Sequence, residues 1–421
     1  MLINNDWSFC KEGDSATIVT LPHDAMLYEK RIEKCRNGVN SGYFPGGKYV
    51  YEKELSLREA EISGKNIQLY FEGVYQKAKV YCNGNFIAEH AYGFTPFYAD
   101  ITECVIPGKN LIRVTVDNSL EPNCRWYSGS GIYRNVHLLI RDRNYIDEVR
   151  VRTLSTSPAV IRVDAYTVGE NQPNCTITGN NLQDMNAELV YADTCEDSRC
   201  HYKAVITVPN AGLWSVDNPN LYECIVKSDK DIYSVKFGIR SITCSAETGL
   251  LINDQEVLLR GGCIHSDNGV LGACSYRDAE FRKVKILKEA GYNAIRCAHN
   301  PACKDFLDAC DEIGMLVLDE AFDGWYTPKT YHDYSRLFND NWRSDLAAMV
   351  RVDFNHPSVI MQSIGNEVSE TATKKGVEMA GEMVANLREL DGTRPVTAGI
   401  NVLLNVLFKL AFNFLKIFVP S

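Results

Sequence analysis

Short apolar runs separated by turn residues recur through the first part of the chain. Residues 49–51, 67–71 and 111–116 are rich in β-branched and aromatic side chains, which favour strands. The pair Asn83-Gly84 lies between two apolar runs, within residues 79–87, and this is a strong signal for a two-residue β-hairpin turn. Residues 1–141 are therefore predicted to form a β-sandwich of the jelly-roll type.

The β character continues from about residue 142 to residue 242. Residues 149–152 and 204–208 alternate apolar and polar side chains with a period of two, as half-buried strands do. The length of this segment fits an immunoglobulin-like β-sandwich. A second all-β domain is therefore predicted over residues 142–242.

The pattern changes after about residue 243, where short apolar strands alternate with longer helical segments. Ser275 and Asp278 have the spacing of a capping box, which predicts a helix that ends near Gly291. Such alternation favours a parallel sheet, and its repetition favours a (β/α)8 barrel. About five strands fit into residues 243–421, so this TIM barrel is predicted to be incomplete. The expected strands are 256–260, 293–296, 315–319, 359–363 and 395–398, and the further helices are 303–313, 341–354 and 373–390.

Composition and charge limit the class of protein. The chain has 421 residues with 45% hydrophobic and 23% charged side chains, which is normal for a globular protein of about two to four domains. The net charge is -10 and no basic stripe is present, so nucleic-acid binding is not expected. Residues 402–419 are strongly apolar, but polar residues interrupt them. This tail is expected to be a core helix without its partners, or an altered reading-frame end, rather than a membrane anchor.

The cysteines indicate a reducing compartment. There are 15 of them, and Cys195 and Cys200, the closest pair, have no histidine behind them at zinc-finger spacing. Most are interpreted as small buried hydrophobes, as with Cys303 and Cys310 on the apolar face of a predicted helix. The N-terminus lacks the basic start and apolar segment of a signal peptide. The protein is therefore expected in the cytoplasm.

Polar side chains follow four successive barrel strands. The C-terminal ends of barrel strands form one rim, which is where active sites lie. Four polar strand ends in succession are difficult to explain as scattered surface residues. They are His265 and Asp267 after the first strand, Arg296, His299 and Asn300 after the second, Asp319, Glu320, Asp323 and Trp325 after the third, and Asn366 and Glu367 after the fourth.

The pair Asn366-Glu367 indicates sugar chemistry. It follows the apolar run 359–361, which is interpreted as a buried strand. A carboxylic acid at a strand end can protonate the leaving oxygen of a glycoside. A glycosidase also needs a second carboxylate, so the pair by itself makes only half of a catalytic site.

Together these motifs resemble glycoside hydrolase family 2, the family of β-galactosidases, β-glucuronidases and β-mannosidases. The resemblance extends over nearly the whole chain, to about residue 401. It rests on residues 21–24 (Leu-Pro-His-Asp) and 125–136 for the jelly-roll domain, 213–222 and 237–240 for the immunoglobulin-like domain, and 293–301 (Asn-Ala-Ile-Arg-Cys-Ala-His-Asn-Pro) and 355–367 (from Asn-His-Pro-Ser to Gly-Asn-Glu) for the barrel.

The resemblance implies roles for individual residues. Glu367 matches the family's catalytic acid/base, and Asn366 matches the residue that hydrogen-bonds the sugar 2-hydroxyl. Arg125, Trp126 and Tyr127 of the jelly-roll domain are expected to reach the sugar, since an aromatic face can pack on a pyranose ring. The residues expected to bind substrate are Asn366, His265, His299, Arg296, Trp126 and Trp325.

Several of these assignments have structural alternatives. Arg296 could instead orient a rim carboxylate as a buried pair. Asp319 and Glu320 are expected to hold other residues of the site in position rather than to take part in the reaction. His299 is as compatible with a structural role in its loop as with sugar contact.

The aromatic and cation assignments are open in the same way. Trp126 and Trp325 are each as compatible with packing as with a sugar platform. A divalent or monovalent cation at His265 and Asp267 has no third clear ligand to support it. No metal site and no cofactor are therefore predicted.

The chain departs from the family pattern in two respects. Gln362 stands where the family commonly has tryptophan. The family's nucleophile, a glutamate at the end of a later strand, has no counterpart after Glu367, and no acidic residue follows Asp391. A retaining mechanism needs two carboxyl groups about 5 Å apart, whereas general acid catalysis alone gives about 10²- to 10⁴-fold. The acidic residues Glu370, Glu378, Glu382 and Glu389 lie in or at the start of the next predicted helix.

The predicted function is hydrolysis of terminal β-linked sugars with retention, foremost of β-galactosides. Little or no activity is expected of this chain, because no nucleophile is found. The expected partner is a β-glycoside substrate, without nucleic acid or membrane, and self-association into a homo-oligomer stays open. The alternatives are a carbohydrate-binding remnant without catalysis, a fragment without function, and β-glucuronidase or β-mannosidase specificity.

Overall fold

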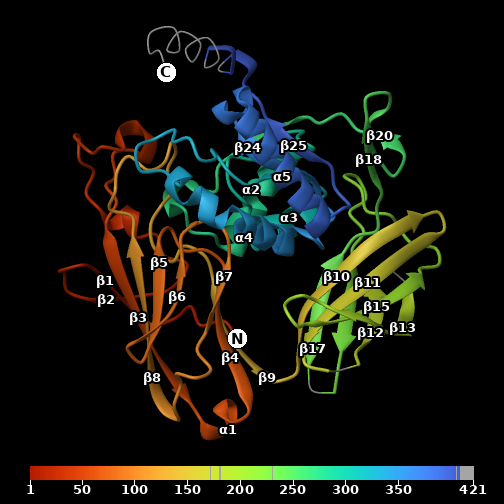
Figure 1. Ribbon diagram of the computed structural model, residues 1–421, viewed down its shortest axis with the longest axis horizontal. Coiled ribbons are helices and arrows are strands. Elements are labelled where there is room, and N and C mark those ends of the chain that lie inside the picture. The colour runs from red at the N-terminus through yellow and green to blue at the C-terminus, as the bar shows by residue number, and fades with distance from the viewer. Residues whose placement is uncertain (171, 180–181, 230, 404, 408–421) are drawn as a thin grey trace.

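The computed structural model describes residues 1–170, 172–179, 182–229, 231–403 and 405–407. Two β-sandwiches, red to orange and yellow to green in Figure 1, flank a third part of helices and strands in teal and blue. The arrangement is the predicted one of jelly roll, immunoglobulin-like sandwich and incomplete barrel. Most of the predicted tail helix over 402–419 lies outside the described residues.

The first domain is a sandwich of a six-stranded and a three-stranded antiparallel sheet. Buried and exposed residues alternate along β8, as a strand with one face in the core requires. The three runs of strand formers predicted from the sequence lie in β3, β4 and β8. In sheet order the strands are β2 (Thr17–Val19), β1 (Trp7–Lys11), β3 (Lys48–Leu57), β8 (Gly108–Asp117), β5 (Ala78–Cys82) and β6 (Asn85–His90), facing β7 (Phe97–Asp100), β4 (Lys65–Phe71) and β9 (Val136–Asp142), with the short helices η1 (Ala25–Tyr28), η2 (Gly38–Ser41) and α1 (Glu59–Ile62) in the connections.

The predicted hairpin turn is confirmed between β5 and β6. Asn83 and Gly84 have φ angles of 50° and 85°. A two-residue turn with both φ angles positive matches the twist of the paired strands, and asparagine and glycine adopt it at low cost. The local sequence was therefore sufficient to specify this connection.

The second domain packs two four-stranded antiparallel sheets around one apolar core. Both strands predicted from alternation are present, in β10 and β15. The sheets are β10 (Tyr145–Thr156), β11 (Ala159–Val168), β15 (Cys200–Thr207) and β14 (Val190–Thr194), and β13 (Leu182–Glu188), β12 (Asn174–Gly179), β16 (Tyr222–Lys227) and β17 (Ile232–Phe237); a small sheet of β18 (Ile242–Ser245), β19 (Gly249–Ile252) and β20 (Gln255–Glu256) follows.

The third part is one sheet of five parallel strands in sequential order with helices between them. Sequential parallel order with helical crossovers is the topology of a (β/α)8 barrel, here with five of its strands. The strands are β21 (Gly261–Ile264), β22 (Ala294–Cys297), β23 (Leu316–Glu320), β24 (Val359–Asn366) and β25 (Val396–Gly399), and the helices are η3 (Gly269–Leu271), α2 (Arg277–Glu289), α3 (Lys304–Ile313), α4 (Ser335–Asp353), η4 (Ser369–Ala372) and α5 (Lys374–Leu390).

Two local predictions about the barrel were wrong. The first barrel strand is β21 and not residues 256–260, because Gly261 is where the chain can pair with β22. A Cβ atom at Gly261 would lie 1.8 Å from the carbonyl oxygen of Ala294, so only glycine fits there. Ser275 makes no capping box either, because its hydroxyl donates to Glu280 (3.1 Å) and the helix begins after Tyr276.

Asp24 joins the jelly-roll domain to the barrel. Its side chain is 1% exposed and accepts four hydrogen bonds. The backbone N–H groups of Met26 and Ser130 donate to Oδ1 (both 3.0 Å), and the N–H of Ala273, in the barrel part, donates to Oδ2 (2.9 Å). The Tyr127 hydroxyl donates to Oδ2 as well (2.7 Å). The Leu-Pro-His-Asp motif is therefore a structural link between domains.

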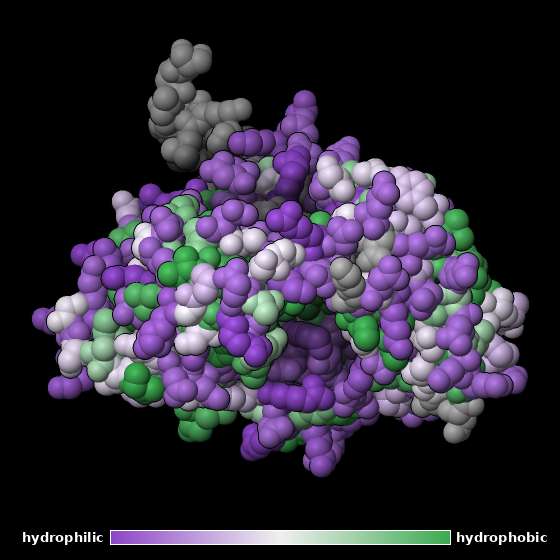
Figure 2. Space-filling view, turned by 90° about the horizontal axis from the view of Figure 1, so that it is seen from below, coloured by the Kyte–Doolittle hydropathy of each residue, from purple (hydrophilic) through white to green (hydrophobic). Residues whose placement is uncertain are grey.

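The immunoglobulin-like domain contacts the barrel on its other side. The indole Nε1 of Trp214, a fully buried residue, donates to the carbonyl oxygen of Asp311 in α3 (2.9 Å). Arg351 of α4 donates to the backbone oxygen of Asp147 (2.7 Å) and pairs with its carboxylate (3.2 Å). Figure 2 shows, from below, a hollow lined by hydrophilic residues at the centre of the molecule. The barrel is thus held by a sandwich on each side.

The environment of the cysteines and the length of the helices test two of the predictions made from the sequence. All 15 cysteines are free, and nine of them are buried, so the interpretation as small buried hydrophobes is confirmed for most. The cytoplasmic location remains a prediction. Within the described ranges, no helix is both long and apolar enough to cross a membrane.

We predict that Asp24→Ala lowers the free energy of unfolding by about 3 kcal/mol, because four buried donors lose their acceptor. Urea-induced unfolding followed by circular dichroism measures this difference. Asp14→Ala, in an exposed turn, is the matched control and should change stability by less than about 0.5 kcal/mol. Equal effects of the two substitutions would contradict the assigned role of Asp24.

Candidate active site

The C-terminal ends of the parallel strands bring the candidate residues to one rim. Arg296 lies on β22, Glu320 ends β23 and Asn366 ends β24, on three neighbouring strands. His265 directly follows β21, and His299 follows β22. Because parallel strands end on the same side of the sheet, residues far apart in the sequence meet here.

Glu320 is the centre of the hydrogen-bond network at the rim. Its side chain has no exposed surface. Arg296 donates from Nη2 at 2.7 Å and 2.9 Å and from Nε at 3.2 Å, so the guanidinium contacts both carboxylate oxygens. His299 donates from Nδ1 at 2.6 Å, and the hydroxyl of Ser363 donates at 2.7 Å. The alternative in which Arg296 pairs with a buried rim carboxylate is confirmed, and direct sugar contact by Arg296 stays a prediction.

The Asn366 side chain is fixed at both ends of its amide. Its Oδ1 accepts a hydrogen bond from Arg296 Nη2 (2.9 Å), and its Nδ2 donates to Asp323 Oδ1 (3.1 Å). Lys329 donates from Nζ to the Asn366 carbonyl oxygen (2.6 Å). A single amide orientation satisfies the donor and the acceptor, because reversing it would oppose like groups. The Asn366 amide is therefore held in one orientation at the rim.

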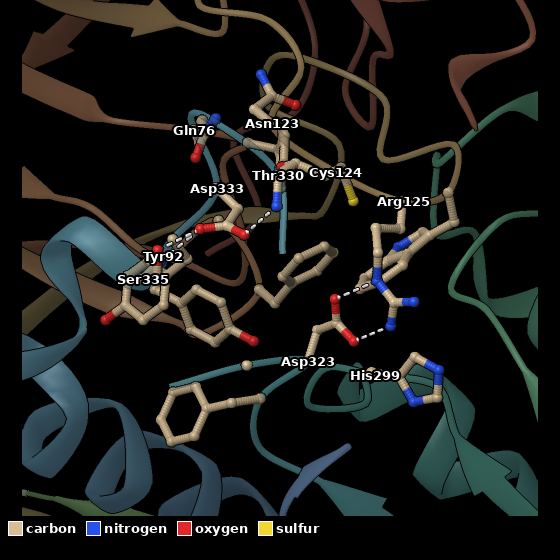
Figure 3. A pocket seen from close by; sticks show the side chains of 17 residues that line it. Gln76, Tyr92, Asn123, Cys124, Arg125, His299, Asp323, Thr330, Asp333 and Ser335 are labelled. Atoms are coloured by element: carbon tan, nitrogen blue, oxygen red, sulfur yellow. Dashed lines mark hydrogen bonds and ion pairs between the residues drawn. The ribbon is translucent and has the colours of Figure 1, made fainter. Parts of the chain in front are cut away.

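Asp323 links the rim to the jelly-roll domain. Arg125 of that domain donates from Nε to Oδ2 (2.8 Å) and from Nη2 to Oδ1, and Lys329 donates to Oδ1 (3.1 Å). Burial alone would raise the pKa of Asp323, but the hydrogen bonds from Arg125 and the charge of Lys329 together lower it to about 2. Asp323 is therefore ionised at neutral pH and engaged with two cations. Figure 3 shows this bidentate pair facing His299.

Glu367 has an unusual backbone conformation at the end of β24. Its φ angle is 44°, in the left-handed region that non-glycine residues seldom adopt. The N–H group donates to the Gly399 carbonyl oxygen on β25 (2.6 Å), and Asn401 Nδ2 donates to the carboxylate (3.1 Å). Strained backbone of this kind gathers at functional sites, where the surrounding structure imposes it. The position of the half-buried carboxylate is thus fixed by the end of β24 and by the chain at and after the end of β25.

One aromatic and two imidazole rings form a wall beside the rim. Trp126 of the jelly-roll domain stacks on His265, with ring centroids 4.9 Å apart at 19°, and meets His299 edge-on at 5.7 Å. His265 donates from Nδ1 to the Ala298 carbonyl oxygen (2.6 Å), and burial lowers the pKa of His265. The indole N–H of Trp126 is buried without a hydrogen-bond partner. The wall therefore combines the Trp126 ring with two imidazoles, and the Trp126 N–H is a donor without a partner among the described residues.

Trp325 differs from the other predicted substrate-binding residues. It is 0% exposed, and its indole N–H donates to the carbonyl oxygen of Ile364 (2.8 Å) beneath the rim. It packs against Gly365, where a Cβ atom would lie 2.7 Å from the indole nitrogen. A ring without exposed surface has no face to offer a sugar, so we interpret Trp325 as packing that supports β24.

A cavity lies beside the Arg125–Asp323 pair, between the jelly-roll loops and the connection from β23 to α4 (Figure 3). Trp126, His299 and Asp323 line it, together with rings such as those of Tyr92 and Tyr334. Within the part of the chain that is described, the one group of three potential metal ligands is Asp308, Asp311 and His356, and none of these is a rim residue.

Sequence reasoning missed Lys329 and the link from Arg125 to Asp323. Both depend on the connection between β23 and α4, residues 321–334, which is long for a barrel loop. Long loops at this end of a barrel often carry function, and that length was a signal available in the sequence. The ion-pair partners of Lys329 and Arg125, however, can be identified only from the structure, in which the jelly-roll loop lies against this connection.

Comparison with known proteins assigns every domain. Residues 4–142 match the sugar binding domain of glycosyl hydrolases family 2, residues 144–240 match a further domain of glycosyl hydrolases family 2, and residues 245–415 match the TIM barrel domain of the family.

Individual relatives agree with these matches. The chain is 34% identical to a β-galactosidase of Bacteroides ovatus, over 94% of this chain and 51% of the relative. It is 33% identical to a putative β-glucuronidase of Formosa agariphila, over 94% of this chain and 39% of the relative. The crystal structure of a family 2 member from Bacteroides cellulosilyticus superposes with a TM-score of 0.88 at 35% identity, and covers 97% of this chain and 57% of that one.

The chain therefore spans about half the length of the relatives it matches. The matches nevertheless run through all three of its domains in the order found in the structure. By sequence and by fold, this chain belongs to glycoside hydrolase family 2.

Proposed function

We propose that this chain carries the acid/base half of a retaining β-glycosidase site, in which Glu367 protonates the leaving oxygen. The observation that supports it is the placement of Asn366 and Glu367 at the end of β24. Arg296 and Asp323 fix the amide there, and β25 fixes the backbone of the acid. An amide held in this way can hydrogen-bond a sugar hydroxyl while the adjacent acid delivers a proton.

The proposed substrate class is a terminal β-galactoside. Relatives named β-galactosidase and β-glucuronidase support a β-glycoside, and the first of them is a β-galactosidase. β-Glucuronidase or β-mannosidase specificity is the alternative. A neutral sugar suits the rings of Trp126 and His265, because an aromatic face packs on the apolar side of a pyranose.

This chain by itself is proposed to have little or no turnover. Two of the other rim carboxylates, Glu320 and Asp323, are already engaged. Glu320 has no exposed surface and accepts from Arg296, His299 and Ser363. Asp323 is held by Arg125 and Lys329. A carboxylate held by a bidentate guanidinium is poorly suited to attack a sugar carbon, so neither replaces the missing nucleophile.

A carbohydrate-binding role without catalysis is the second candidate. The unused N–H of Trp126 and the preoriented amide of Asn366 favour it, because binding needs neither a nucleophile nor a closed barrel. The two candidates share a rim and differ in turnover.

We predict that the purified chain hydrolyses p-nitrophenyl β-D-galactoside at most about 10²- to 10⁴-fold faster than the uncatalysed reaction, the range of general acid catalysis alone. Any turnover should disappear with Glu367→Gln and persist with Glu378→Gln, an exposed glutamate of α5. Release of nitrophenol, measured against an enzyme-free blank, gives both rates.

The outcomes separate the two parts of this proposal. Efficient turnover that is lost with Glu367→Gln would contradict the claim that a nucleophile is missing. Turnover that survives Glu367→Gln would contradict the assignment of the acid/base.

We predict that galactose binds the chain at millimolar concentration and that Asn366→Ala weakens this binding about tenfold, the loss expected for a hydrogen bond of about 1.4 kcal/mol. Isothermal titration calorimetry measures both affinities. Asn85→Ala, on an exposed strand of the jelly-roll domain, is the control and should bind as the unchanged chain does. No heat of binding at millimolar galactose would count against a sugar site at this rim.

A further inference from the structure

A second cavity lies at the opposite end of the barrel from the candidate active site. Its walls come from the end of β10, from the segment that leads into β18, and from the segments that precede β24 and β25. It encloses about 930 Å³ of space, including the part open to solvent. The cavity therefore lies at the junction of the immunoglobulin-like domain and the barrel.

The walls of this cavity are strongly basic. Three arginines line it, and none of the lining residues is an aspartate or a glutamate. The chain as a whole has ten more acidic than basic side chains, so the absence of carboxylates here is a local feature. His356 also lines the cavity, but its Nδ1 is bonded to the Asp311 carboxylate (2.5 Å). The lining arginines are Arg152, Arg240 and Arg394.

Arg152 has no direct ion pair among the described residues, although the charges of Asp164 and Asp391 partly offset the effects of burial and of Arg162, which lower its pKa. Its guanidinium makes no hydrogen bond or ion pair with any residue that the structure describes, and its Nε is buried. It faces Arg162 directly across the β10–β11 pair, and like charges in that position repel. Arg162 is neutralised by Asp164 (2.8 Å), whereas Arg152 only packs near the Phe354 ring (5.5 Å). A cation without a direct ion pair in a cavity wall is available to an anion.

Arg240 adds a second guanidinium without a direct ion pair among the described residues, although the charges of Asp391 and Asp311 favour its charged form. It is 8% exposed and donates from Nε and Nη2 to the carbonyl oxygens of Pro357 (2.6 Å) and Val359 (2.9 Å). These partners carry no charge, and Nη1 has no acceptor among the described residues. Burial, and then the charge of Arg394, lower the pKa of Arg240 to about 9. Arg394 is compensated, because its Nη1 pairs with Asp391 (2.5 Å).

We propose that this cavity is a binding site for a small doubly charged oxyanion of the phosphate class, with Arg152 and Arg240 as its cationic ligands. Two guanidinium groups without a direct ion pair match the charge of a dianion. A planar guanidinium also suits the bidentate geometry of phosphate oxygens. The hydroxyls of Ser155 and Ser241 in the same wall are further donors. Because the walls come from two domains, a bound anion would strengthen the junction between them.

The test is binding of inorganic phosphate to the full chain, followed by isothermal titration calorimetry and by the melting temperature Tm, with sodium chloride added to keep the ionic strength constant. We expect a saturable rise in Tm, as for any ligand that binds the folded state only. Arg152→Gln should weaken phosphate binding about tenfold or more, the loss of a charge-assisted hydrogen bond. Arg343→Gln, an exposed arginine of α4 paired with Glu382, should bind phosphate normally.

Three results would overturn this proposal. The first is a phosphate effect no larger than that of chloride at the same ionic strength. The second is equal phosphate affinity of the unchanged chain and Arg152→Gln. Without phosphate, Arg152→Gln should leave Tm unchanged or raise it, because the substitution removes an unpaired charge opposite Arg162, and a lower Tm would also contradict the proposal.

A further comparison identifies the source of the phosphate group. Tighter binding of glucose 6-phosphate than of inorganic phosphate would support a sugar phosphate as the ligand. Tighter binding of inorganic phosphate would support the free ion. Both results support an oxyanion site, and both should depend on Arg152.

Discussion

Burying a carboxylate is costly unless other groups satisfy it, and this condition at Glu320 organises the rim of the barrel. Glu320 has no exposed surface, so its oxygens require donors from the protein. Arg296 on β22, His299 after it and Ser363 on β24 supply them. The three strands are thereby fixed relative to one another, and the same guanidinium then positions Asn366. Glu320 thus holds the ends of these three strands together at the candidate site.

The jelly-roll domain completes this network from outside the barrel. Arg125 reaches Asp323 from a position 198 residues earlier in the chain, and Asp323 holds the other end of the Asn366 amide. Trp126, from the same loop, stacks on His265. The candidate site is therefore shared between two domains, and the buried Asp24 that joins them also keeps the site in alignment.

The two ends of the barrel differ in how their charged side chains are paired. At the rim, the carboxylates of Glu320 and Asp323 are each paired with at least one cation. At the other end, Arg152 and Arg240 line a cavity without carboxylates. Since an unpaired charge in a partly buried wall is unfavourable, the second end is suited to an anionic ligand.

The sequence alone determined the order of domains, most strands and helices, and the position of Asn366-Glu367 at a strand end. These features follow from local patterns, such as the Asn83-Gly84 turn and the apolar run before Asn366, which act within a few residues. Only the tertiary structure decided that Trp325 is buried, that Lys329 reaches Asn366, and that the first barrel strand begins at Gly261. Each of these depends on the close approach of segments distant in the sequence, and no periodicity along the chain records which segments meet.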